Sequence, residues 1–404
     1  MGNPPIPRMG RGALWLLAAM VGAVLCGAAQ AGEFSGYAAL EARYFPDDPA
    51  DPAQFEGETF SLAVSLEYYV DWDDGTQRFV ASLFGRLDQN DDRRTHFDIR
   101  ELYWEKVTRW LEVRAGLRKV FWGVAESQHV VDIINQTDLV ENIDAEDKLG
   151  QPMVDAAIVT DYGVVELYAM PFSRERTFPG IEGRLRTIPH VDVDRPLYES
   201  SAEETHFDWA VRYSNTFGIF DIGVAHFSGT SRQPQFVFDP AGAVLQPFYE
   251  IMRQTSTDVQ ATTGAALWKL EGRYNDGIGE PFVSLTAGIE YTFFTLLGNN
   301  VDLGALAEYS YDDRDNFQIV PFQDDVFVGA RLALNDVQDT QVLGGFVKDL
   351  DVSSILSLIE ASRRIGNRWR LEFEFRGFHN VHDDDVLRLF RRDSYFQLDL
   401  ARYF

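Results

Sequence analysis

The sequence has few basic residues, one Cys and no long apolar run beyond residue 31. It carries 36 Lys and Arg against 63 Asp and Glu in 404 residues, a net charge of −27. So acidic a chain excludes a nucleic-acid partner, because phosphate backbones require a positive surface. A single Cys excludes a disulfide framework and a cysteine-rich metal site. The lack of a later run of about 18 apolar residues excludes a helical inner-membrane protein.

The N-terminus has the layout of a secretory signal peptide. Two arginines precede an apolar run that starts at Ala13 and ends in the small residues Ala29-Gln30-Ala31. We therefore expect residues 1–31 to be a cleaved signal peptide. Cleavage would remove both arginines, no acid and the only Cys, so the net charge would change from −27 to −29.

Apolar and polar residues alternate along most of the remaining chain. Residues 60–72, 283–293 and 369–377 each place apolar side chains on one face and polar side chains on the other. This period of two predicts strands. Most of these stretches have the about 9–11 or more residues that a membrane-spanning strand needs, whereas globular strands have about 5–6. Ile99 and Leu102 can share a strand face only if a bulge separates them.

The connections between these stretches alternate between short and long. The short ones carry the Gly, Asn and Asp residues of hairpin turns, and they lie near 73–76, 161–163, 215–218, 297–300, 335–338 and 365–368. The long ones are acidic, and most contain Pro; they span 46–59, 123–151, 173–205, 231–250, 312–324 and 380–386. Short periplasmic turns and long extracellular loops are typical of outer-membrane barrels.

We therefore predict an all-β fold: a transmembrane antiparallel up-and-down β-barrel of about 18 strands, with 16 as the alternative. Residues 32–404 would form this barrel as a single domain. Residues 395–404, which end in Phe404, resemble the C-terminal strand by which Gram-negative barrels are recognised for assembly, although Arg402 stands where an aromatic is usual. The resemblance implies an outer-membrane location and the barrel-assembly machinery as a partner. Outer-membrane lipid and lipopolysaccharide would surround the barrel, and a periplasmic or inner-membrane export partner remains open.

If the apolar strand faces meet lipid, the polar faces line the lumen. The predicted pore-lining residues are Glu112, Arg114, Arg118, Arg212, Lys269, Glu271, Arg273, Glu290, Arg331, Arg370, Glu372, Glu374 and Arg376. Residues 123–151 combine apolar side chains with acids, and a purely solvated loop would not carry that apolar content. We predict that this segment folds inward and narrows the pore, with constriction residues Asp132, Asp138, Glu141, Asp144, Glu146 and Asp147. A loop that lies over the barrel mouth is the alternative.

Several motifs resemble a family of uncharacterised proteobacterial porin-like barrels, broadly similar to alginate-export-type channels. These motifs lie at 100–104, 117–123, 132–139, 307–314 and 324–331. The resemblance implies an outer-membrane channel and supplies no substrate. The family often has Pro where Gln136 stands in this chain.

The expected function is passive or facilitated passage of a polar or amphiphilic solute. A plugged structural or export-complex barrel and a transporter of hydrophobic compounds are the alternatives. His226 and Ser228 share a strand face and faintly resemble the His-x-Ser site of outer-membrane phospholipases, but the family's Asn-Gly continuation is absent. We expect no enzyme, no catalytic residue and no dedicated metal site. Ca²⁺ or Mg²⁺ bound at acidic loops, such as the one around His379 and His382, remains open.

Overall fold

A closed ring of 18 antiparallel strands forms the wall of the molecule. The computed structural model describes residues 32–296, 300–314 and 322–404, so the expected signal peptide lies outside the described residues. Strand β1 (Glu33–Tyr44) pairs with β2 (Glu58–Trp72) on one side and with β21 (Tyr395–Tyr403) on the other, which closes the sheet. The other wall strands follow in chain order: β3 (Gln77–Asp88), β4 (His96–Val107), β5 (Leu111–Arg118), β6 (Gln151–Thr160), β7 (Gly163–Met170), β9 (Asp208–Phe217), β10 (Phe220–Thr230), β13 (Ile251–Thr263), β14 (Ala266–Asp276), β15 (Phe282–Leu296), β16 (Val301–Asp312), β17 (Asp324–Ala333), β18 (Gln341–Asp349), β19 (Ile355–Ile365) and β20 (Trp369–His379).

The predicted barrel and its strand count are confirmed, and the alternative of 16 strands is wrong. The described residues also contain two short 3-10 helices, η1 (Glu203–Thr205) and η2 (Val386–Phe390). No helix in that part of the chain is long and apolar enough to span a membrane.

The alternating sequence decides which side chains face outward. On β2, Phe60 and Leu62 are 54% and 40% exposed, whereas their neighbours Ser61 and Ala63 are 4% and 3% exposed. The apolar face is therefore the outer surface of the wall, and the polar face points into the barrel. This inverts the arrangement of a soluble sheet and suits a wall surrounded by lipid.

A β-bulge in β4 restores the alternation of inward and outward side chains along this strand. Glu101 pairs with Ser82 and Ile99 pairs with Leu83, so Arg100 is the extra residue between them. The bulge returns Ile99 and Leu102 to one face, which the sequence allowed only with such a bulge, and it leaves Arg100 buried inside the barrel.

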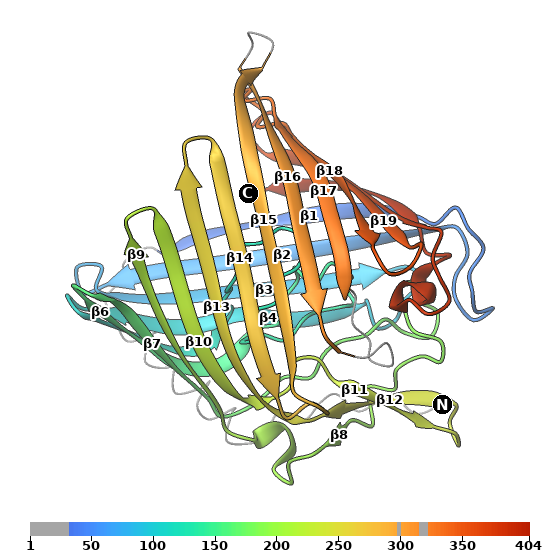
Figure 1. The fold of residues 1–404 in the computed structure, drawn as a ribbon, viewed down its shortest axis with the longest axis horizontal. Coiled ribbons are helices and arrows are strands. Elements are labelled where there is room, and N and C mark those ends of the chain that lie inside the picture. Colours follow the sequence, from blue (N-terminus) through green and yellow to red (C-terminus); the bar gives the residue numbers. More distant parts are fainter. Residues whose placement is uncertain (1–31, 297–299, 315–321) are drawn as a thin grey trace.

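The short turns and the long connections lie at opposite rims of the barrel (Figure 1). The long-loop rim carries a small sheet that the sequence analysis missed, in which β12 (Val244–Tyr249) pairs with β11 (Gln235–Asp239) and β8 (Leu197–Tyr198). The expected loops 173–205 and 231–250 are therefore partly strands. These strands have two to six residues, too few to show a clear alternation.

Gly116 on β5 lies where two neighbouring wall strands approach each other closely. It has a φ of +141°, and a Cβ there would lie 2.1 Å from the backbone oxygen of Leu102. We expect Gly116→Ala to destabilise the barrel by about 1–3 kcal/mol, measured as a lower Tm of the purified protein in detergent. Gly272→Ala is the control, because its Cβ would meet no atom closer than 3.6 Å. Equal Tm values for the two variants would contradict the close approach.

Candidate functional site

The connection between β5 and β6, residues 119–150, runs through the inside of the barrel; we call it the lumen segment. Its first part contacts β14, β16 and β17, through Glu271, Glu308 and Arg331. Its later part contacts β3, β4 and β20. Because β4 and β16 lie on opposite sides of the ring, the segment crosses the lumen and does not lie over the mouth.

Two wall carboxylates hold the first part of the lumen segment by its backbone. Glu271 accepts hydrogen bonds from the amides of Val124 and Ala125, at 2.6 and 2.8 Å, and from the amide of Val131 at 3.3 Å. Glu308 accepts hydrogen bonds from the amide of Glu126 at 2.9 Å and from Ser127. An irregular segment inside a barrel has backbone donors without ladder partners, and these carboxylates supply the acceptors.

The apolar residues of the segment explain why it folds inward. Val130, Val131, Ile133 and Ile134 are at most 5% exposed. They belong to a buried cluster with wall residues from six strands and with the segment's own Trp122, and the wall members include Met153, Tyr168, Phe227 and Met252. Burial of these side chains stabilises the inward conformation by removing apolar surface from water.

Arginines of the wall bind the acids of the second part of the segment. Arg86 on β3 contacts Glu141 at 2.7 Å, and the bulged Arg100 contacts Asp138 at 2.6 Å. Arg376 on β20 contacts Asp144 at 3.2 Å. Asn142 donates to Glu374 at 3.1 Å. Glu141 and Asp138 are almost completely buried, so the loss of either arginine would leave an uncompensated charge.

The two halves of the lumen differ in their access to solvent. On β2, the inward residues Thr59, Ser61, Ala63 and Ser65 are buried at the long-loop end, and Glu67 nearer the short turns is exposed. On β13 the inward residues run from Met252 and Gln254, at 2% and 1% exposed, to an exposed Thr262. The half toward the long loops is therefore filled, and the half toward the short turns is open to water.

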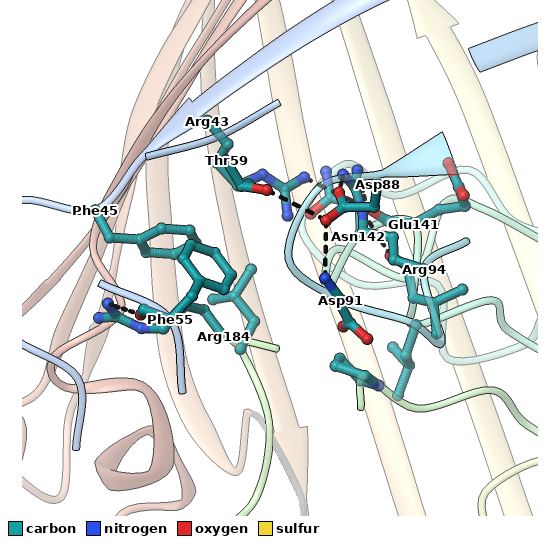
Figure 2. A pocket seen from close by; sticks show the side chains of 14 residues that line it. Arg43, Phe45, Phe55, Thr59, Asp88, Asp91, Arg94, Glu141, Asn142 and Arg184 are labelled. Atoms are coloured by element: carbon teal, nitrogen blue, oxygen red, sulfur yellow. Dashed lines mark hydrogen bonds and ion pairs between the residues drawn. The ribbon is translucent and has the colours of Figure 1, made fainter. Parts of the chain in front are cut away.

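The filled half contains a small cavity, which Figure 2 shows. Charged side chains converge on it from β1 (Arg43), from the β3–β4 connection (Asp91 and Arg94) and from the lumen segment (Glu141). Its volume is about 20 Å³, which is room for about one water molecule. No solute larger than water fits there in this conformation.

The predicted pore-lining residues share the inward strand faces, and most form ion pairs. Arg114 contacts Glu112, Arg118 contacts Asp155, Arg212 contacts Asp258, Arg273 contacts Asp312, Arg331 contacts Glu126, Arg370 contacts Glu372, and Arg376 contacts Glu374. Lys269 lies 3.7 Å from Glu290 and 3.9 Å from Glu308, and Glu271 binds backbone amides. The passage of a solute past these side chains stays a prediction.

The predicted constriction residues lie inside the barrel but have different partners. Asp138, Glu141 and Asp144 bind wall arginines, as described above. Asp132 pairs with Lys148 at 3.0 Å and Glu146 pairs with His129 at 3.0 Å, both within the segment. Asp147 forms no ion pair among the described residues, and its side chain is exposed.

A buried cluster that was not predicted from the sequence ties β1 to β3 and to the β3–β4 connection. Glu41 lies 2.8 Å from Arg86 and 2.7 Å from Arg94, and Arg94 also contacts Asp88 at 2.8 Å. The period-two pattern of the first strand places Glu41 and Arg43 on the inward face, so that signal was available. Their partners could not be found from the sequence, since those partners lie on other strands and in the β3–β4 connection.

Neither candidate metal site gains support. His96, Asp138 and Glu141 place ligand atoms within 4.8 Å of one another, but Arg100 and Arg86 already neutralise the two carboxylates. Near His379 and His382, the acids Asp383 and Asp384 are exposed, and Asp383 pairs with Arg391 at 2.9 Å. Divalent ions at the acidic loops remain an open prediction.

His226 and Ser228 lie on the outward face of β10. His226 hydrogen-bonds Thr255 on β13 at 2.9 Å, and its ring lies 5.4 Å from that of Trp209. The only hydrogen-bond partner of the imidazole among the described residues is therefore Thr255, and no contact joins it to Ser228. The arrangement that would activate a serine hydroxyl is not formed.

Comparisons with known proteins identify a fold and no family. No family model matches this chain, and no curated protein matches it. It is similar to the solved structure of Wzi, a carbohydrate-binding β-barrel involved in group 1 capsule assembly in Escherichia coli, with 10% identity, a TM-score of 0.53, and coverage of 98% of this chain and 89% of that one. OprB of Pseudomonas putida, at 11% identity, matches with a TM-score of 0.44 over 92% of this chain and 94% of its own. A mutant porin of Rh. blastica matches with the same identity and TM-score, over 92% of this chain and 100% of its own.

The similarity to Wzi extends to the fold alone at this identity. This chain therefore has the fold of an outer-membrane β-barrel. No sequence match supports the resemblance to alginate-export-type channels, which stays a prediction.

The carboxylates of Glu271 and Glu308 should control how firmly the lumen segment is held. We expect the Glu271→Gln and Glu308→Gln double variant to expose residues 124–131, because charge-assisted hydrogen bonds contribute about 1.5–3 kcal/mol each. Hydrogen exchange of these amides should accelerate by about tenfold or more. Glu290→Gln is the matched control, since Lys269 is the one ion-pair partner of Glu290 among the described residues. Unchanged exchange in the double variant would show that the apolar cluster alone holds the segment.

Asp147 should make the segment sensitive to pH. Although much of the side chain is exposed, partial desolvation of its carboxyl group, together with the charges of Glu141 and Asp144, raises its pKa to about 7. Because the folded pKa exceeds the ordinary value of about 4, ionisation should weaken the inward conformation as pH rises from about 4 to 7. Exchange protection of residues 136–148 should fall several-fold over that range. Asp147→Asn should remove the trend, and a trend that persists in this variant would assign it to another group.

Proposed function

We propose that this protein is an outer-membrane channel through which a polar or amphiphilic solute passes, with the lumen segment as its constriction. The observation that carries the proposal is the difference between the two lumen halves, one hydrated and one closed by a segment held through polar contacts. A ring of 18 strands is wide enough for an aqueous passage. The charged inner face argues against a transporter of hydrophobic compounds, which would need an apolar pocket inside the wall.

In this proposal the chain is exported by residues 1–31, which are then removed. The barrel-assembly machinery recognises the terminal strand that ends in Phe404. The short turns face the periplasm and the long loops face the outside, so the hydrated half opens toward the periplasm. The outer surface contacts lipid and, in the outer leaflet, lipopolysaccharide.

Planar-bilayer conductance of the refolded barrel tests the constriction. Replacement of residues 130–148 by a short Gly-Ser linker should raise the single-channel conductance severalfold, because it removes the part of the segment that crosses the lumen. The Glu271→Gln and Glu308→Gln double variant, which keeps the full chain, should increase the frequency of open events. An unchanged conductance in both variants would show that the segment does not limit passage.

A second candidate function is a plugged barrel that serves in a structural role or in an export complex. The nearly complete burial of inward residues in the long-loop half favours it. The absence of both ion conductance and liposome swelling, in the wild type and in the variant without residues 130–148, would support this function over a channel. We propose no enzymatic activity, because His226 and Ser228 do not contact each other.

A further inference from the structure

Arginines of the connections 171–207 and 231–250 form ion pairs almost without exception. In residues 171–207, Arg174 contacts Asp98, Arg184 contacts Asp393, Arg186 contacts Asp51, and Arg195 contacts Asp192 and Asp239. In residues 231–250, Arg232 contacts Asp208 at 2.9 Å. Arg176 alone among these arginines has no carboxylate partner within the described residues.

The contacts of Arg176 are neutral. Its backbone amide donates to the Tyr249 hydroxyl at 2.9 Å. Its Nε donates to the side-chain oxygen of Gln136 at 3.1 Å, and Nη2 donates to the Thr137 hydroxyl at 3.5 Å. The remaining nitrogen, Nη1, has no partner among the described residues. A guanidinium carries five donors in a planar fork, so this one has unused donors.

The residues that contact Arg176 are almost completely buried. Gln136 and Thr137 are 1% and 4% exposed, and Tyr249 is 2% exposed. Tyr249 stacks on Tyr198 with ring centroids 5.4 Å apart. The backbones of Asp138 and Thr177 form a β-bridge that aligns the lumen segment with this connection. Burial lowers the pKa of Arg176 to about 10, so the side chain still carries its charge at neutral pH.

A partly buried charge without a counter-charge is costly, and such a charge is ordinarily paired. The other arginines of these two connections follow that rule, since each has a carboxylate partner. Guanidinium matches the geometry of carboxylate, phosphate and sulfate better than other side chains do. Arg176 itself is partly accessible to solvent, so an external anion can reach it.

We propose that Arg176 is the centre of an oxyanion-binding site between the lumen segment and the connection 171–207. The ligand is a small oxyanion, or a solute that carries one, and its oxygen atoms accept hydrogen bonds from the guanidinium. The fixed Gln136 and Thr137 hold that guanidinium in place. Anion binding at Arg176 does not require that the barrel conducts solutes. A failure of this proposal can therefore be distinguished from a failure of the proposed channel function.

Equilibrium dialysis of the full-length barrel in detergent tests this site, with radiolabelled acetate and inorganic phosphate as separate probes at constant ionic strength. The wild type should bind one equivalent of at least one probe. Binding of acetate alone would identify a carboxylate ligand, and binding of phosphate alone would identify a tetrahedral oxyanion; either result supports the site.

Arg176→Gln should weaken the binding by about tenfold or more, because it removes the charge and keeps a polar side chain. Arg195→Gln is the matched control, since Arg195 is an exposed arginine of the same connection with two carboxylate partners. Arg176→Lys keeps the charge but loses the planar fork, and it should show intermediate affinity if the barrel folds. No binding to the wild type, or equal binding to the wild type and Arg176→Gln, would overturn the proposal.

Discussion

The structure depends on the closure of the sheet between β1 and β21. In lipid every backbone N–H and C=O group of the wall needs a protein partner, and a sheet with free edges cannot supply them. Pairs such as Leu40 with Leu400 and Ala39 with Ala401 remove both edges at once. A closed barrel of 18 strands has a lumen that is too wide for the side chains of the wall to fill. The lumen must therefore contain water, other parts of the chain, or both.

One half of the lumen is open to water, and the other half is filled by chain. Toward the short turns the inner face is polar and hydrated, which requires only that its charges find partners or water. Toward the long loops the lumen segment enters, and its irregular backbone brings donors that no strand ladder satisfies. The carboxylates of Glu271 and Glu308 meet those donors, while Ile133 and Ile134 bury apolar surface in the same region. Polar anchoring and apolar packing therefore act on adjoining residues of the lumen segment.

Much of the wall could be predicted from the sequence, since a period of two reports directly which face a side chain occupies. The bulge at Arg100 was foreseeable for the same reason: without it, Ile99 and Leu102 fall on opposite faces. The alternating pattern predicts which face of the wall a side chain occupies, but it does not predict which residue that side chain contacts. The contact of Glu141 with Arg86, or of Glu308 with the amide of Ser127, depends on where an irregular segment passes along the inner wall. Strands as short as β8 leave no periodic signal.

The charge distribution of the barrel explains why its buried arginines lie where they do. Acids outnumber bases in the chain, so arginine is the scarcer partner, and nearly every buried arginine is matched to a carboxylate from another element. Such pairs hold the lumen segment, the loop connections and the wall in one register, since each charge is costly without its partner. In an interior built this way, the guanidinium of Arg176, which contacts only a side-chain amide and a hydroxyl among the described residues, is the exception. Its missing counter-charge is most simply supplied from outside the chain.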